Sequence, residues 1–325
     1  MKPNYPKQVS LARLPTPIDP MERLSKHLGG PNLYIKRDDQ TGLATGGNKT
    51  RKLEFLVADA IAQGCDHLIT AGGPQSNHCR QTAAAAARFG LGCSLVLTNQ
   101  KPKRRVGNLL LNELLGAYIY WAEKKERQSK MQEVANELKA MGRIPYIIPV
   151  GGSNVIGATG YVQAMGELSE QLQTHRLFID FIVLASGSGG TQAGMVLGKK
   201  VYNHRSNILG ISISQPADAI KNQVAALVTA TATHLGLGML PLTEDIDVND
   251  DYLGEGYSIV GEAEREAVQM TAQFEGILLD PVYTGRAMAG LIDLIRWGAF
   301  TRGQNILFWH TGGQAALSAF ANKLR

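Results

Sequence analysis

The chain has 325 residues, of which 44% are hydrophobic, and a formal net charge of +5 at pH 7. This length is too great for one compact core, so we expect two domains, and the mild charge gives little reason to expect a nucleic-acid partner. No run of about 18 apolar residues argues for a membrane span, and the first residues lack the apolar stretch of a signal peptide.

The cysteines and histidines give no sign of a metal site. Cys65, Cys79 and Cys93 are odd in number and lack metal-binding spacing, which suits free thiols in a reducing compartment. The histidines are scattered and form no H-E-x-x-H motif. Strand-like and helix-like patterns alternate along the chain, so we expect a cytoplasmic α/β enzyme with largely parallel sheets.

In chain order, the first predicted elements are a short helix near residues 21–28, a strand at 33–36 and a helix from about 50 to 63. In the last of these, apolar residues recur at helical spacing from Leu53 to Ile61, while Arg51, Lys52 and Glu54 lie on the other side. This pattern predicts an amphipathic helix with one apolar and one polar face.

Lys49 stands between the turn Gly46-Gly47-Asn48 and the start of that helix. Most lysines are solvated surface charges, and that interpretation stays open for this one. The turn and the helix fix its backbone, however, and a lysine fixed in this way can form a Schiff base with an aldehyde cofactor.

The next block repeats strands and helices at short spacing. We expect strands at 67–71, 94–98, 118–121 and 146–149, and helices at about 108–115 and 128–141. A further helix, from Ser76 or Asn77 to before Gly90, contains five consecutive alanines, which are strong helix formers. Residues 50–165 are therefore predicted to form a small doubly wound domain. The basic run at 101–105 favours a solvated loop, with a rim that attracts an anionic substrate as the weaker alternative.

Apolar runs at 181–185, 208–213 and 305–309 suit buried parallel strands of a second sheet. The first is followed by a glycine-rich turn, 187–190, that opens a helix. Bare amides at such a turn, with a helix N-terminus behind them, form an anion nest, to which Ser188 and Thr191 add hydroxyls. A plain tight turn is the alternative. A dinucleotide fingerprint would need glycine where Gln192 stands.

Two more polar clusters follow predicted strands, where open α/β sheets bind ligands. In the first, 75–78, either Ser76 or Asn77 is expected to cap the helix, leaving the other to face a ligand. His78 is a candidate acid/base residue, with a side chain that points elsewhere from the first helical turn as the alternative. The second combines residues 280–285 with 310–313. Tyr283 alone suits a core aromatic, but the glycines around its neighbours indicate a backbone approached closely by a ligand.

These clusters together suit a pyridoxal phosphate site, and here a family resemblance becomes specific. The chain resembles the D-cysteine desulfhydrase and 1-aminocyclopropane-1-carboxylate deaminase family over nearly its whole length, from Leu14-Pro15-Thr16-Pro17 to Gly313. The resemblance implies a tryptophan-synthase β-like fold, with a small domain (50–165) inserted in a large cofactor-binding domain (1–49 and 166–325), and a homodimer. It rests on Gly46-Gly47-Asn48-Lys49, Gln75-Ser76-Asn77, Gly187-Ser188-Gly189-Gly190-Thr191, Asp280-Pro281-Val282-Tyr283-Thr284-Gly285 and His310-Thr311-Gly312-Gly313.

The resemblance also implies roles for individual residues. Lys49 would bond the cofactor, with Asn48 beside it, and Asn77 would contact the cofactor's ring hydroxyl. The phosphate would be bound by Ser188, Gly189, Gly190 and Thr191. The active-site serine and the two tyrosines of the family match Ser76, Tyr257 and Tyr283.

Two positions discriminate between activities within the family. The cyclopropane deaminases carry glutamate and leucine where this chain has Thr284 and Thr311, as the desulfhydrases do. A glutamate at the pyridine nitrogen would make the ring a deep electron sink, and a hydroxyl does so less. β-Elimination needs only a transient carbanion and a good leaving group, so the threonines indicate D-cysteine as substrate, with pyruvate, ammonia and hydrogen sulfide as products.

Three alternatives stay open. Cysteate sulfo-lyases share the motifs around Lys49 and Tyr257, and a sulfonate would then be bound by a basic side chain such as Arg286 or Arg80. The cyclopropane deaminase activity is the second. A dehydrogenase-like nucleotide-binding protein built on the loop at 187–190 is the third, although it leaves Lys49 unexplained.

Overall fold

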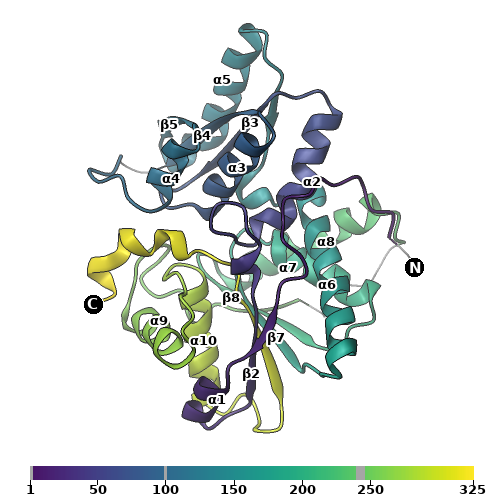
Figure 1. The fold of residues 1–325 in the computed structure, drawn as a ribbon, viewed down its shortest axis with the longest axis vertical. Helices are drawn as coiled ribbons and strands as arrows, with labels where there is room; N and C mark the ends of the chain where they lie inside the picture. The colour runs from purple at the N-terminus through teal and green to yellow at the C-terminus, as the bar shows by residue number, and fades with distance from the viewer. Residues whose placement is uncertain (1–2, 99–100, 239–245) are drawn as a thin grey trace.

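The computed structural model describes residues 3–98, 101–238 and 246–325, and in these the chain forms two sheets, each covered by helices on both faces (Figure 1). The six-stranded sheet has the order β1-β2-β10-β7-β8-β9, and the four-stranded sheet has the order β5-β4-β3-β6. Apart from the antiparallel β1/β2 pair, the described ladders are parallel. The α/β class with parallel sheets is therefore confirmed.

The large sheet is packed between two groups of helices. Its strands are β1 (Ile18–Pro20), β2 (Asn32–Lys36), β7 (Phe181–Ser186), β8 (Asn207–Ser212), β9 (Asp247–Asn249) and β10 (Asn305–Trp309). One face is covered by α6 (Val155–His175), α7 (Gly190–Val201) and α8 (Ala217–His234). The other is covered by α1 (Glu22–Leu28), α9 (Glu262–Glu275) and α10 (Thr284–Arg296). The apolar runs predicted at 181–185, 208–213 and 305–309 are its central strands.

The small sheet is built in the same way. Its strands are β3 (His67–Gly72), β4 (Gly92–Thr98), β5 (Tyr118–Ala122) and β6 (Pro145–Ile147). One face is covered by α2 (Lys49–Ala62), α3 (Asn77–Arg88) and α4 (Asn108–Leu114), and the other by α5 (Arg127–Ala140). The alanines of α3 are largely buried against the sheet, which lets helix and sheet approach closely. Each of these elements was predicted to within a few residues.

Helix α2 departs from the prediction of a polar face. Arg51, Lys52 and Glu54 are all buried, because α2 packs between α3 and α6 rather than at the surface. Glu54 accepts hydrogen bonds from the backbone of Leu11 and Ala12, both at 2.9 Å. The polar side of this helix therefore faces other polar groups inside the protein, and not solvent.

The best-connected of these groups is Arg51. Its guanidinium donates to both oxygens of Asp38, at 2.8 and 2.9 Å, and to both oxygens of Glu167, at 2.8 and 2.9 Å. Asp38 also accepts from Tyr161 and Trp309. Because these partners come from α2, α6 and the ends of β2 and β10, this cluster ties the start of α2 to the large sheet.

Helix α6 was not predicted. It runs without interruption from Val155 to His175, so residue 165, at which the predicted domain boundary falls, lies inside a helix. Its glycines allow close packing: a Cβ on Gly160 would lie 2.4 Å from the carbonyl oxygen of Arg51. The division into residues 50–165 and the remainder stays a prediction.

In the part of the chain that the structure describes, none of the helices combines the length and the hydropathy needed to cross a bilayer.

Candidate active site

Four helices begin at the residues that the sequence singled out. Lys49 is the first residue of α2, Asn77 of α3, Gly190 of α7 and Thr284 of α10. The strands β3, β7 and β10 end just before three of the predicted clusters. Helix N-termini carry partial positive charge and free amides, so a site built from several of them favours an anionic ligand.

Lys49 is linked to the glycine loop by one intervening side chain. Its Nζ donates to Asn48 Oδ1 at 2.9 Å, and Asn48 Nδ2 donates to Thr191 Oγ1 at 2.9 Å. Burial, together with the charge of Arg80, lowers the pKa of Lys49 to about 8, against the opposite effect of Asp280. A larger fraction of its amine is therefore uncharged at neutral pH than in an ordinary lysine, which is what a nucleophilic lysine requires.

The turn before Lys49 requires glycine. Gly47 has a φ of 124°, and a Cβ on it would lie 2.7 Å from Gln81 Nε2 and 3.2 Å from the carbonyl oxygen of Thr311. The Asn48 amide donates to that same carbonyl at 2.9 Å. The turns before Lys49 and after β10 thus lie directly against each other, which brings two of the predicted clusters together.

The loop at 187–191 leads into α7 as an anion nest would. Gly189 is in the left-handed region with a φ of 72°, and no side chain caps the helix N-terminus in the described structure. The hydroxyls of Ser188 and Ser153 are 2.8 Å apart. A Cβ on Gly190 would lie 2.5 Å from Ser153 Oγ and 2.8 Å from Lys52 Nζ, so the surface here is bare backbone flanked by polar groups.

Lys52 was missed by sequence reasoning as a site residue. Its side chain is buried, and its Nζ donates to the carbonyl of Gly151 at 3.1 Å and to Ser153 Oγ at 3.4 Å. Burial, reinforced by the charge of Lys49, holds the pKa of Lys52 well below its ordinary value. Among the described residues no carboxylate forms an ion pair with it. Its spacing of three from Lys49 on one helix is the signal that could have indicated it.

In the cluster at 75–78, the structure shows which of Ser76 and Asn77 caps the helix, a choice that the sequence left open. Ser76 is the cap of α3, accepting a hydrogen bond from the Cys79 amide at 3.2 Å, and Asn77 is the first helical residue. Asn77 Oδ1 accepts from Asn108 Nδ2 at 2.7 Å, which leaves the Asn77 amide group to act as a donor. The His78 side chain lies with its Nε2 2.8 Å from Thr70 Oγ1, which favours the second of its two interpretations.

Tyr257 and Tyr283 form a pair, with their hydroxyl oxygens 2.6 Å apart. Burial raises the pKa of Tyr257, and burial together with the neighbouring Tyr257 and, to a smaller extent, Asp280 raises the pKa of Tyr283 well above its ordinary value. Both rings lie at a cleft of about 450 Å³ that is also lined by Gly73, Gln75, Arg104 and the 3-10 helix at Gln314–Lys323. Tyr283 is therefore at an accessible surface and not in a core.

The two threonines differ in what surrounds their hydroxyls. Thr284 is fully buried, and its Oγ1 donates to Asp280 Oδ1 and accepts from the Asp280 amide, both at 2.9 Å. The Asp280 carboxylate also accepts from the amides of Val282, Tyr283 and Thr284, each at 3.0 Å. The Thr311 hydroxyl has no such partner in the described structure. A Cβ on the nearby Gly313 would lie 2.4 Å from Asp280 Oδ1, which places the two turns in contact.

Arg286 is not available to a substrate, contrary to one alternative weighed for it. Its guanidinium is 1% exposed and donates to Glu264 at 2.7 Å, and to the carbonyls of Ile213, Gly256 and Ile259. It therefore supports the segment that carries Tyr257.

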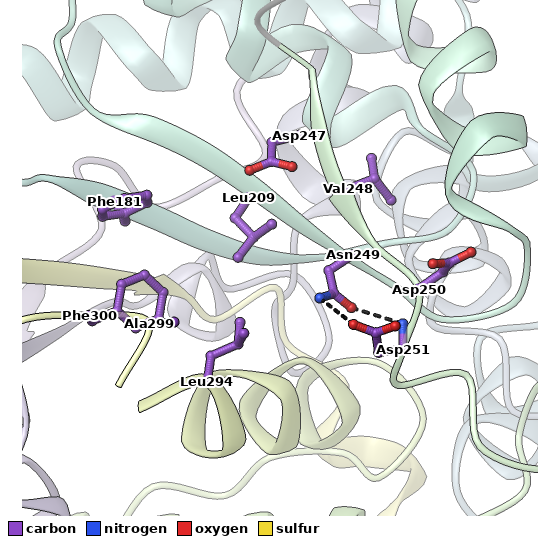
Figure 2. Close-up of a pocket in the computed structure, with 10 residues that line it drawn as sticks. All are labelled: Phe181, Leu209, Asp247, Val248, Asn249, Asp250, Asp251, Leu294, Ala299 and Phe300. Atoms are coloured by element: carbon purple, nitrogen blue, oxygen red, sulfur yellow. Dashed lines mark hydrogen bonds between the residues drawn. The ribbon is translucent and has the colours of Figure 1, made fainter. Parts of the chain in front are cut away.

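A second cleft, of about 360 Å³, is lined by residues of β7, β8 and β9, by Asp250 and Asp251 after β9, and by Leu294, Ala299 and Phe300 near the end of α10 (Figure 2). None of the predicted site residues lines it.

Comparisons with known proteins identify the family and the fold. The family described as "Pyridoxal-phosphate dependent enzyme" matches residues 9–312. A D-cysteine desulfhydrase of Salmonella newport is 44% identical over 319 residues, covering 96% of each chain. A solved structure, described as that of an ACC deaminase homologue, is 38% identical with a TM-score of 0.90, covering 98% of this chain and 95% of the other. A threonine deaminase of Solanum lycopersicum, 19% identical with a TM-score of 0.68 over 95% of this chain and 82% of the other, shares the fold.

Proposed function

Because this chain belongs to the family of pyridoxal-phosphate dependent enzymes and has their tryptophan-synthase β-like fold, we propose that it catalyses β-elimination on D-cysteine. One molecule of water is consumed, and pyruvate, ammonia and hydrogen sulfide are released. The observation that carries the proposal is the pair of threonines, Thr284 and Thr311, in a chain 44% identical to a D-cysteine desulfhydrase over 96% of its length.

The residues present fit pyridoxal 5′-phosphate. Lys52 is a buried lysine without a carboxylate partner, and it borders a glycine at which any Cβ would collide with its surroundings. A phosphate beside Gly190 would supply the missing negative charge. We infer that the amides and hydroxyls of Ser188, Gly189, Gly190 and Thr191 bind this group together with Lys52.

When bound, the cofactor supplies an electron-withdrawing ring that stabilises negative charge at the substrate Cα. Lys49 would hold the cofactor through its amine, and the same amine, when free, would move the α-proton of the substrate. Its lowered pKa favours this because the free amine is the proton acceptor. Asn48 holds Lys49 Nζ at 2.9 Å, and the Asn77 amide, oriented by Asn108, would donate to the ring hydroxyl of the cofactor.

Ser76 and the two tyrosines complete the proposed site. Ser76 binds the substrate carboxylate through its hydroxyl proton, because that oxygen already accepts from Cys79. Tyr257 and Tyr283 share one hydrogen bond at 2.6 Å, so the pair has a second proton to donate to the departing sulfur. Their raised pKa values keep both hydroxyls protonated at neutral pH.

Thr311 is the hydroxyl that we place at the pyridine nitrogen. Thr284 does not contact the ring in this proposal, because its hydroxyl is hydrogen-bonded to Asp280; it acts by holding the turn at Asp280. The Asp280 carboxylate is in turn bonded to three backbone amides, so it does not take the place of the glutamate that the cyclopropane deaminases carry. A neutral hydroxyl at the ring suits elimination of a good leaving group better than the opening of a cyclopropane ring.

Cysteate sulfo-lyase activity is the second candidate, favoured by Arg104. This side chain lies on the basic run at 101–105 and lines the cleft beside Tyr257 and Tyr283, where it would attract a sulfonate. Pro102 and Arg104 of this run line the cleft, and its lysines and arginines are exposed, as a solvated loop would have them.

Ammonia release from D-cysteine, L-cysteine, L-cysteate, D-serine, β-chloro-D-alanine and 1-aminocyclopropane-1-carboxylate tests the proposal, because all six would give ammonia, whereas the four-carbon cyclopropane substrate would give 2-oxobutanoate in place of pyruvate. D-Cysteine should have the highest kcat/KM. A preference for the cyclopropane substrate would refute the threonine argument, and a preference for cysteate would keep elimination but make sulfite the leaving group. A purified protein that gains no visible absorbance band with the cofactor would favour the dehydrogenase-like alternative.

We also propose that the enzyme is a homodimer in the cytoplasm. Leu114 on α4 and Tyr118 on β5 are large apolar side chains, 73% and 64% exposed, and a second copy could cover them. The three buried free thiols suit a reducing compartment. Sedimentation velocity tests the first statement, and fractionation of cells tests the second.

A further inference from the structure

Arg80 is a buried cation whose role the proposed chemistry leaves open. It lies on α3, three residues after Asn77, and its side chain is fully buried. Among the described residues no carboxylate forms an ion pair with it, and burial lowers its pKa to about 10. A buried charge without a counter-charge destabilises the folded protein, so we expect Arg80 to have a role other than packing.

The first contacts of Arg80 are with the turn that precedes Lys49. Its Nη1 donates to the carbonyl of Ala44 and its Nη2 to the carbonyl of Gly46 at 3.0 Å. In this turn three consecutive non-glycine residues, Leu43 to Thr45, have positive φ angles, a conformation that side chains with a Cβ disfavour. Arg80 therefore stabilises an unfavourable backbone shape directly before Lys49.

Its remaining donor acts on the other side of the site. Arg80 Nε donates to Asn108 Oδ1 at 2.8 Å, and this fixes which end of the Asn108 amide carries the nitrogen. Asn108 Nδ2 then donates to the carbonyl of Gln75 at 2.8 Å and to Asn77 Oδ1 at 2.7 Å. Through this chain Arg80 determines that Asn77 presents its amide protons, and not its oxygen, to the ring.

We propose that Arg80 is a positioning residue of the active site, which fixes the turn before Lys49 and the orientation of Asn77. This deepens the proposed function and rests on it.

The protonation of Lys49 is set by all of the charged groups around it, of which Arg80 is one. Asp280, before α10, favours its protonated form, whereas Arg80 from α3 disfavours it. Lys52 on α2 and the neutral His78 on α3 are also close enough to interact with it. Removing the Arg80 charge leaves Asp280 less opposed, so the lysine nitrogen should keep its proton to higher pH.

The test is the pH midpoint at which the loaded enzyme loses the visible absorbance of its protonated lysine–cofactor bond. In Arg80→Gln this midpoint should rise by roughly one pH unit. Arg80→Lys keeps the charge but not the three-way fork, so its midpoint should stay near that of the unmodified enzyme while the cofactor dissociates faster. Arg88→Gln, on the same helix and exposed, is the matched control and should change neither.

If Arg80→Gln does not fold, the same pH midpoint is measured in Asn108→Asp. It is nearly isosteric, places a carboxylate against Arg80 and reverses the Asn77 amide, and both effects should raise the midpoint. An unshifted midpoint in Arg80→Gln, or in Asn108→Asp, overturns the proposal, and so does an equal shift in Arg80→Lys. If the unmodified enzyme forms no visible band at all, the proposed function fails instead.

Discussion

Replacing Lys52 with methionine should affect the cofactor-free and the loaded protein in opposite directions. Without cofactor, the Lys52 amine is buried, bonded to one carbonyl and one hydroxyl, and its pKa is held well below the ordinary value, chiefly by burial. The unfolded chain binds this proton with its ordinary affinity, so the group destabilises the folded state increasingly as pH falls below the lysine's unfolded pKa. Methionine has similar length and no charge, and removes that penalty.

The size of each effect follows from the contacts. A hydrogen bond to a charged group contributes about 1.5–3 kcal/mol, so losing the contact of Lys52 with a phosphate should weaken cofactor binding roughly 10- to 150-fold. In the cofactor-free protein, the loss of an unpaired buried charge should raise the free energy of unfolding by about 1 kcal/mol or more at neutral pH.

Two measurements on one variant separate these effects. Fluorescence titration of the cofactor-free protein gives the Kd for pyridoxal phosphate, and urea denaturation of the same preparation gives its stability. Lys139→Met, an exposed change of the same kind on α5, is the matched control and should alter neither. If Lys52→Met left the Kd unchanged, Lys52 would not contact the phosphate, and if it destabilised the cofactor-free protein, the argument from burial would be wrong.

Four further outcomes are expected. Lys49→Ala should abolish the visible band and lower turnover about a thousandfold or more, and a variant that kept both would contradict the role of Lys49. Gly189→Asp puts a charge at a residue with a φ of 72°, so the cofactor should be lost on dialysis, as absorbance would show. The rate at which the cofactor-free protein recombines with cofactor should rise with pH to a plateau with a midpoint near the Lys49 pKa of about 8, and a midpoint near that of free lysine would count against its burial. Thr311→Val should lower kcat without changing stability, whereas Thr284→Val should lower stability by about 1–3 kcal/mol, because it leaves buried partners unpaired; calorimetry distinguishes the two.

Local sequence chemistry was enough to predict most of the elements that carry the site. The alternation of buried strands with helical periodicity placed α2 and α3 to within a few residues and indicated where α7 begins, and the turns before Lys49 and at 187–190 contain glycines at which a Cβ would collide with neighbouring atoms. Ser76 as a cap and His78 turned away also follow from position in the first helical turn. These features depend on neighbours within about one turn, which is why they can be read from the chain.

Features that depend on distant partners could not be predicted in this way. Helix α6 contains Gly157, Gly160 and Gly166, which weaken a helical pattern, yet each glycine sits where a Cβ would collide with another segment. Tertiary packing therefore outweighs local propensity there. In the same way Thr284 and Thr311 look equivalent in the chain, and only the folded turn at Asp280 shows that one hydroxyl is engaged and the other is available.

The roles of Arg51 and Lys52 also depend on distant partners. Whether a buried basic side chain is paired with carboxylates indicates whether it stabilises the fold or binds a ligand. Arg51 belongs to a balanced cluster in which two cations, Arg51 and Lys36, meet two carboxylates, Asp38 and Glu167. Lys52, the next residue, lies in a different environment. It is one of three buried basic side chains, with Lys49 and Arg80, and among the described carboxylates only Asp280 acts on Lys49. A balanced cluster is complete without a ligand and serves the fold, whereas an excess of buried positive charge beside bare amides is stabilised by binding an anion. Arg51 and Lys52 are adjacent on α2 but have different roles. Arg51 is paired with carboxylates and stabilises the fold, whereas Lys52 has no carboxylate partner and is the residue that we expect to bind the phosphate.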